Sequence, residues 1–196
     1  MGKLDLSKAI TALKNGQVIV YPTDTLYGLG ADIFNDNAVK KVFQIKKRPK
    51  NDPLPVAVSS IDELEKIAFA DDITRSLVES FLPGKLTLIL KKKSVVSDVV
   101  TGGLDKVAVR IPKNEVALEL LSKFGPLTAT SANIHGRKTP GIISDIRMQF
   151  KDADVAVYLD DGGLDSRPST IVDMTQKPIK IVRKGAITEK DIMDAI

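Results

Sequence analysis

The chain of 196 residues contains no cysteine and no tryptophan, and His135 is its only histidine. The lack of cysteine excludes disulfides and thiol nucleophiles, and with a single histidine it also excludes zinc sites of the ordinary type. A Ser-His-Asp triad would have to use His135, which lies in a polar loop beside Gly136 and is expected to face solvent. Any chemistry must therefore rest on lysine, arginine, aspartate, serine, threonine and asparagine side chains.

The chain is also poor in aromatic residues and in long apolar runs. Aromatics make up 5% of its residues, which gives little support for base stacking on single-stranded nucleic acid. No apolar run approaches the roughly 20 residues that cross a bilayer, and residues 1–10 alternate charged and apolar side chains. We therefore expect a cytoplasmic protein without a signal peptide or membrane contact.

Positive charge and apolar residues, by contrast, are well represented. Lysine and arginine number 29 against 25 acidic residues, which gives a formal net charge of +4. The basic residues gather in short runs such as Lys46–Lys50 and Lys91–Lys93, so an anionic partner is expected. With 43% hydrophobic residues the chain can bury one substantial core. Its length, and the lack of a repeat or linker, predict a single domain over residues 1–196.

Apolar residues alternate between helical and extended spacing along the chain. Helices are predicted at 5–15, 72–81, 114–124 and 144–150, and others are predicted to begin at Asp36 or Asn37, at Ser60 and at Thr188. Strands are predicted at 18–21, 55–58, 86–90, 107–111, 127–129, 155–159, 170–173 and 179–182, with a loop at 24–30. The alternation predicts an α/β fold with one twisted, open, mixed β-sheet and flanking helices, in which the late strands pair antiparallel.

Two glycine-containing segments look like phosphate-binding motifs but lack essential positions. After Gly28–Gly30, the third glycine of a dinucleotide-binding fingerprint is replaced by Ile33. Gly84 and Lys85 lack both the upstream glycine and the following hydroxyl residue of a Walker A loop. A phosphate group would have to be held by other residues.

Basic and polar side chains elsewhere are suited to that task. Lys46 and Arg48 lie near the end of a predicted helix, and they supply a point charge and a planar guanidinium that both suit phosphate. Ser131 and Asn133 bracket a small residue, a pattern that favours close approach of backbone amides to an anion. Arg110 stands inside an apolar strand, so it must point into a cleft or pair with an acid.

Four polar segments follow or flank predicted strands, and they are Tyr21–Gly30, Lys46–Pro49, Thr130–Asn133 and Pro168–Asp173. In open α/β sheets, the loops that follow strands meet at one edge, and ligands bind there. The four segments together therefore predict a phosphate site at one edge of the sheet.

In this order the four segments resemble the YrdC-type threonylcarbamoyl-AMP synthase family in its short, single-domain form, over residues 18–185. The resemblance implies a YrdC-like fold and a nucleotidyltransferase that makes threonylcarbamoyl-AMP and pyrophosphate from L-threonine, bicarbonate or carbon dioxide, and ATP. The product would serve threonylcarbamoyl-adenosine modification of tRNA, so a downstream tRNA threonylcarbamoyl transferase complex is an implied partner. The implied cofactor is Mg²⁺ that arrives with ATP, and no protein metal site is expected.

The resemblance also implies roles for individual residues. Lys46 and Arg48 would be catalytic. The implied ATP-binding residues are Lys46, Arg48, Ser131, Asn133 and Arg183. The implied threonine-binding residues are Thr25, Arg110, Thr130 and Ser169, with Arg110 paired to the threonine carboxylate. The chain departs from longer members of the family at Ala57, where they often have histidine, and at Asp52, where they often have asparagine.

Two other functions fit parts of the pattern. A binding module for structured RNA, such as tRNA, ribosomal RNA or another double-stranded RNA, would use a basic cleft and would bind with steep salt dependence. A carbamoyl-adenylate domain, like those in hydrogenase-maturation proteins, would use an acceptor other than threonine. Such domains accompany zinc-finger-like and acylphosphatase-like regions, for which 196 residues leave no room.

Overall fold

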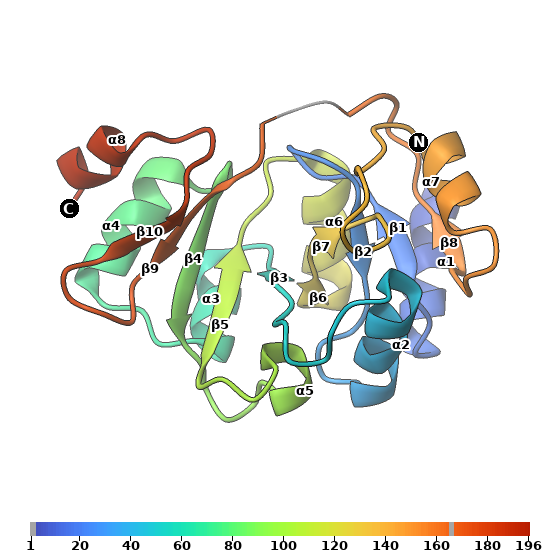
Figure 1. Cartoon of the computed structure of the whole chain (residues 1–196), viewed down its shortest axis with the longest axis horizontal. Helices are drawn as coiled ribbons and strands as arrows, with labels where there is room; N and C mark the ends of the chain where they lie inside the picture. The colour runs from blue at the N-terminus through green and yellow to red at the C-terminus, as the bar shows by residue number, and fades with distance from the viewer. Residues whose placement is uncertain (1–2, 165–166) are drawn as a thin grey trace.

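The structure is a computed structural model that describes residues 3–164 and 167–196, and its strands form two hydrogen-bonded sheets (Figure 1). One sheet has four strands in the order β7-β2-β1-β8, and the other has six in the order β10-β9-β4-β5-β3-β6. The predicted α/β class is confirmed, but the prediction of a single sheet is wrong. The chain changes sheets at Ala129, because the residues before it pair with one sheet and the residues after it pair with the other.

The four-stranded sheet consists of β1 (Ile19–Tyr21), β2 (Gly28–Gly30), β7 (Thr130–Ser131) and β8 (Val157–Tyr158). The loop predicted at 24–30 is therefore partly wrong, because Gly28–Gly30 pairs antiparallel with β1. A Cβ atom on Gly30 would lie 2.8 Å from the Tyr21 ring. These glycines thus permit a close approach of the ring to the strand, and they do not mark a turn.

The six-stranded sheet consists of β3 (Val56–Ala57), β4 (Leu86–Lys91), β5 (Lys106–Arg110), β6 (Leu127–Thr128), β9 (Thr170–Asp173) and β10 (Lys180–Arg183). Strand β4 pairs antiparallel with β5 and parallel with β9. The predicted antiparallel pairing of late strands is confirmed for β9 and β10. It is wrong for β8, which pairs parallel with β1 in the four-stranded sheet, because the chain crosses to the six-stranded sheet only between β8 and β9.

The helices are α1 (Lys3–Lys14), α2 (Asp36–Lys46), α3 (Ile61–Ile67), α4 (Asp72–Phe81), α5 (Asp98–Thr101), α6 (Glu115–Phe124), α7 (Ile143–Gln149) and α8 (Glu189–Asp194). The caps predicted at Ser60 and Thr188 are confirmed. The cap predicted for α2, Asp36 or Asn37, is one or two residues too late: Asn35 has the extended backbone of an N-cap, and its side chain accepts hydrogen bonds from two following amides.

The helices cover the sheets so that one face of the six-stranded sheet stays open. In Figure 1, α3 and α4 lie behind that sheet. Helices α1 and α6 pack with β1 in a separate apolar cluster that includes Leu13, Leu120 and Ile19. Within residues 3–164 and 167–196, no helix has the length and apolar character to cross a bilayer.

Thr128 joins the two sheets where they meet. Its amide donates to the Ala31 carbonyl at 2.9 Å, and its hydroxyl accepts from the Ala31 amide and donates to the Leu29 carbonyl. The Tyr21 hydroxyl donates to the Thr128 carbonyl at 3.0 Å. Because these groups are buried, losing one hydrogen bond would leave a costly unpaired partner. The junction therefore fixes the strand ends that surround the site.

Candidate active site

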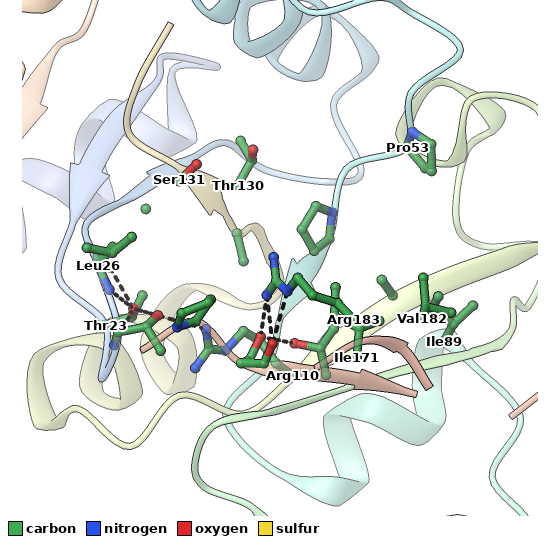
Figure 2. Close-up of a pocket in the computed structure, with 18 of the residues that line it drawn as sticks. Thr23, Leu26, Pro53, Ile89, Arg110, Thr130, Ser131, Ile171, Val182 and Arg183 are labelled. Carbon is green, nitrogen blue, oxygen red and sulfur yellow. Dashed lines mark hydrogen bonds between the residues drawn. The ribbon is translucent and has the colours of Figure 1, made fainter. Parts of the chain in front are cut away.

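A cavity of about 580 Å³ opens between the two sheets (Figure 2). Both sheets contribute to its lining, β2 and β7 from one and β4, β5, β9 and β10 from the other. Seven of the predicted site residues line it: Thr25, Arg48, Arg110, Thr130, Ser131, Ser169 and Arg183. The other two, Lys46 and Asn133, lie behind the lining. The four predicted segments thus converge, but on a cavity between two sheets and not at the edge of one sheet.

Arg110 is fixed at one end of the cavity by contacts from three directions. Its Nη2 donates to Asp24 Oδ1 at 2.6 Å and to the Gly84 carbonyl at 3.3 Å, and its Nη1 donates to Thr25 Oγ1 at 3.2 Å. Both members of the Arg110–Asp24 ion pair have side chains that are 8% exposed. Arg110 therefore both points into a cleft and pairs with an acid, as its place in an apolar strand predicts.

The turn that carries Thr25 is held by a neighbouring hydroxyl. Thr23 Oγ1 donates to the Leu26 carbonyl at 2.6 Å and accepts from the amides of Thr25 and Leu26. A threonine hydroxyl that bonds to backbone groups two and three residues away is typical of a tight polar turn. The turn places Thr25 beside Arg110.

Arg183 and Ser169 form a second hydrogen-bonded group in the cavity lining, and Figure 2 shows Arg183 beside Arg110. The Nε and Nη2 atoms of Arg183 donate to the Ser169 carbonyl at 3.0 and 2.9 Å, and Nη2 also reaches Ser169 Oγ. Burial lowers the pKa of Arg183, and the nearby charge of Arg110 lowers that pKa further. Two guanidinium groups thus face the same part of the cavity.

Arg48 lies at the other end and is more open to solvent. Its Nη2 is 2.8 Å from Asp52 Oδ1, and its guanidinium also donates to the carbonyls of Asp52 and Pro53. The exposed fractions of the two side chains are 17% and 39%. Lys47 turns the chain out of α2 through a left-handed conformation with φ 52°, which aims Arg48 away from the helix.

Lys46 does not line the cavity, although its role was predicted together with that of Arg48. Its ammonium donates to the carbonyls of Ser131 and Asn133 and to Asn133 Oδ1, and the residue is 1% exposed. Burial lowers the pKa of the amine to about 7, and the charge of Arg48 lowers it further while Asp52 raises it. All three ammonium protons are thus directed at the 131–133 segment.

The backbone amides of that segment are already paired, contrary to the prediction that they face an anion. The amide of Ala132 donates to the Tyr27 carbonyl, that of Asn133 to Ser131, that of Ile134 to the Gln149 side chain, and that of His135 to Lys46. Two of these partners come from other elements of the fold, which the local pattern could not indicate. The exposed position predicted for His135 is confirmed.

Thr87 and Lys106 also line the cavity, although they lie outside the four predicted segments. Thr87 Oγ1 lies 2.9 Å from Ser169 Oγ, and Lys106 pairs with buried Asp173 at 2.8 Å. Thr87 is a polar residue inside an apolar strand, so the reasoning that identified Arg110 would have found it. Lys106 had no comparable signal, since its partner lies 67 residues away.

The floor of the cavity between these polar groups is apolar. It is formed by side chains of the six-stranded sheet, namely Ile89, Ala108, Ile171 and Val182, and by Leu104 from the loop before β5. Of the two positions that depart from longer family members, Asp52 lines the cavity, whereas Ala57 is fully buried in β3. In the part of the chain that the structure describes, no group of three His, Cys, Asp or Glu side chains is placed to hold a metal ion.

Comparison with known proteins agrees with this architecture. A family model described as telomere recombination, Sua5/YciO/YrdC, matches residues 11–185. The threonylcarbamoyl-AMP synthase of Pyrococcus abyssi is 38% identical over 189 residues, which cover 94% of this chain and 55% of the relative. The synthase of Aliivibrio fischeri is 31% identical over 173 residues, which cover 86% of this chain and 94% of that protein.

Solved structures give the same result. Pyrococcus abyssi Sua5 complexed with L-threonine superimposes with a TM-score of 0.94 at 36% identity, over all of this chain and 58% of that one. Escherichia coli YciO superimposes with a TM-score of 0.87 at 28% identity, over 95% and 92% of the two chains. The chain therefore belongs to the Sua5/YciO/YrdC family of threonylcarbamoyl-AMP synthases.

Proposed function

We propose that this protein makes threonylcarbamoyl-AMP and pyrophosphate from L-threonine, bicarbonate or carbon dioxide, and ATP. The observation that carries the proposal is a single cavity with an ion-paired arginine at each end, Arg110 and Arg48, and an apolar floor between them. Such a cavity suits two substrates that each carry an anionic group and must meet at their reactive ends. The Aliivibrio fischeri synthase, matched over nearly its whole length, supports an activity contained in a chain of this size.

Threonine would bind at the end that contains Arg110. The guanidinium would take the carboxylate, because Arg110 is held in place by Asp24, Gly84 and Thr25 before any ligand arrives. The hydroxyls of Thr130 and Ser169 line the same cavity and would accept or donate hydrogen bonds to the amino acid. The relative from Pyrococcus abyssi, solved with L-threonine, supports threonine as a substrate of this chain.

ATP would bind with its phosphates toward Arg48 and Ser131, and Arg183 would face the nucleotide from the opposite sheet. The apolar floor would support the base. Lys46 and Asn133 would act by holding the segment that carries Ser131, because their polar atoms contact that segment and not the cavity.

The reaction requires no protein nucleophile. The threonine amine attacks carbon dioxide, or bicarbonate with loss of water, and loses a proton to give a carbamate. A carbamate oxygen then attacks the α-phosphorus of ATP, and the bond to the pyrophosphate oxygen breaks. The residues of this chain would orient the two substrates and balance their negative charge, which agrees with the absence of cysteine and the exposure of His135.

Mg²⁺ would arrive with ATP. Magnesium sites of this kind use one or two carboxylates together with substrate phosphates, and the half-exposed Asp52 carboxylate beside Arg48 fits that requirement. When bound, the ion would neutralise phosphate charge during departure of pyrophosphate. The product would pass to a tRNA threonylcarbamoyl transferase complex in the cytoplasm, and direct contact of this protein with tRNA remains a prediction.

The proposal is tested by incubating the purified chain with radiolabelled L-threonine, bicarbonate, ATP and Mg²⁺. We expect a labelled adenylate and an equal amount of pyrophosphate, and neither product when bicarbonate or threonine is omitted. An Arg110→Gln variant serves as the control for threonine binding. ATP binding without a threonine-dependent adenylate would contradict the proposal and favour another acceptor.

A further inference from the structure

The cavity is lined by four basic side chains, and they differ in how their charge is balanced. Three of them have an acidic partner: Arg48 with Asp52, Lys106 with Asp173, and Arg110 with Asp24. Within the described ranges, the fourth, Arg183, has no carboxylate within ion-pair distance and donates to Ser169 instead. The cavity end with Arg110 and Arg183 thus holds two guanidinium charges and one carboxylate, Asp24.

Asp24 balances the charge of Arg110 from a position outside the cavity lining. It does not line the cavity, and its side chain is 8% exposed. Its Oδ1 accepts from Arg110 Nη2 at 2.6 Å, while Asp24 Oδ2 and Arg110 Nε are buried without a hydrogen-bond partner among the described residues. The carboxylate therefore supplies charge to this end of the cavity without occupying the space that a ligand would fill.

The balance of charge at this end affects which anion can bind there. Arg110 and Arg183 lie close enough for one charge to disfavour the other. With Asp24 present, this end carries a net charge of about +1, which balances the single negative charge of one carboxylate. Without Asp24, two partly buried guanidiniums would face the cavity with no counter-charge, and that arrangement favours a dianion such as phosphate.

We propose that Asp24 is a specificity-determining residue whose charge restricts the Arg110 end to a single carboxylate and keeps phosphate groups out of it. The inference rests on the proposed function, in which an amino acid and a triphosphate share one cavity. A triphosphate bound at Arg110 would block the amino acid, so a fixed negative charge behind that arginine prevents the two substrates from exchanging places. Specificity obtained by disfavouring the wrong ligand is common in binding sites.

Calorimetric titration with inorganic phosphate and with L-threonine tests this inference. Asp24→Asn keeps the shape of the side chain and removes its charge. We expect this variant to bind inorganic phosphate about tenfold more tightly than the wild-type chain, a difference of about 1.4 kcal/mol, and phosphate should then compete with threonine. The double variant Asp24→Asn with Arg110→Gln should lose the gain. Asp98→Asn, which removes a carboxylate that pairs with Lys92 outside the cavity lining, should leave the competition as in the wild type.

Unchanged phosphate affinity in a folded Asp24→Asn variant would overturn the inference, as would a gain that persists without Arg110. Equal loss of threonine and phosphate binding would indicate a structural role only and would also overturn it. If the variant does not fold, the wild-type chain decides: phosphate that displaces bound threonine contradicts the inference, and phosphate that leaves threonine bound supports it. Because phosphate binding needs no turnover, its result is separate from the success or failure of the synthase assay.

Discussion

The two ends of the cavity hold an arginine in different ways. At one end, Arg110 and Asp24 are both 8% exposed and are linked across 86 residues of sequence. At the other, Arg48 and Asp52 are four residues apart, and their side chains are 17% and 39% exposed. The first pair is fixed by the packing of two sheets, whereas the second is a local contact at the edge of a loop.

The difference shows how the two ends can serve different substrates. A buried pair holds its geometry because breaking it leaves an uncompensated charge, so the Arg110 end is preorganised for one small anion. A half-exposed ion pair contributes little to the free energy of folding in water. Asp52 can therefore release Arg48 and contact another cation or solvent with little loss of stability. We expect the Arg110 end to set substrate identity and the Arg48 end to adapt to a flexible polyphosphate.

The strongest test of this comparison is the loss of Arg110. Arg110→Gln leaves Asp24 buried without a partner, so the free energy of unfolding should fall by about 3 kcal/mol. Urea unfolding followed by circular dichroism measures this loss. Combining Arg110→Gln with Asp24→Asn should restore a large part of it, since no unpaired charge remains. A loss no greater than that of Arg48→Gln would contradict the proposed difference between the ends.

Arg48→Gln should lower the activity strongly and the stability only slightly. Because the Arg48–Asp52 pair is partly exposed, the free energy of unfolding should change by less than about 1 kcal/mol. The kcat/KM for ATP should fall about a hundredfold, since the variant loses a charged contact to developing phosphate charge. Pyrophosphate release at varied ATP concentration provides the measurement, with KM for threonine as the internal control. A variant that loses stability and keeps its activity would reverse the assignment.

The lowered pKa of Lys46 predicts how the stability of the protein depends on pH. Its pKa is lowered from 10.5 to about 7 in the folded chain, so between these values the unfolded chain binds more protons than the folded one. Stability must then rise with pH across this window, by up to about 1.4 kcal/mol per pH unit. Below pH 7 both states carry the proton and the dependence vanishes.

Lys46→Met removes the titrating group and keeps an apolar chain of similar length. Urea unfolding of both proteins from pH 6 to pH 10 separates this contribution from that of other groups. We expect the stability of the wild-type chain to rise relative to the variant above pH 7. Parallel curves for the two proteins would show that the Lys46 amine is not perturbed by burial.

Asp52→Asn should have the smallest effect. The carboxylate is 39% exposed, so the loss of stability should stay below about 0.5 kcal/mol and should disappear at high salt. Thermal unfolding at low and at high sodium chloride concentration measures both features. An effect that persists at high salt would indicate that this pair is as fixed as the Arg110 pair.

The sequence predicted the element types well where the signal is local. Helix α4 was predicted with the bounds that the structure shows, because its apolar spacing and its flanking residues agree. Gly28–Gly30 was missed as a strand, because its glycines accommodate the ring of Tyr21 on the neighbouring strand. A glycine that permits close packing and a glycine that permits a turn look the same in one sequence.

By itself, the sequence determined most of the helices and strands, the four polar segments, and a chemistry without cysteine or histidine. These features depend on residue type and on spacing over a few positions. Only the tertiary structure decided that Lys46 supports the segment carrying Ser131, that Thr87 and Lys106 join the cavity, and that Asp24 stands behind Arg110. Such contacts join residues far apart in the chain, so they follow from how the two sheets pack, which local periodicity does not encode.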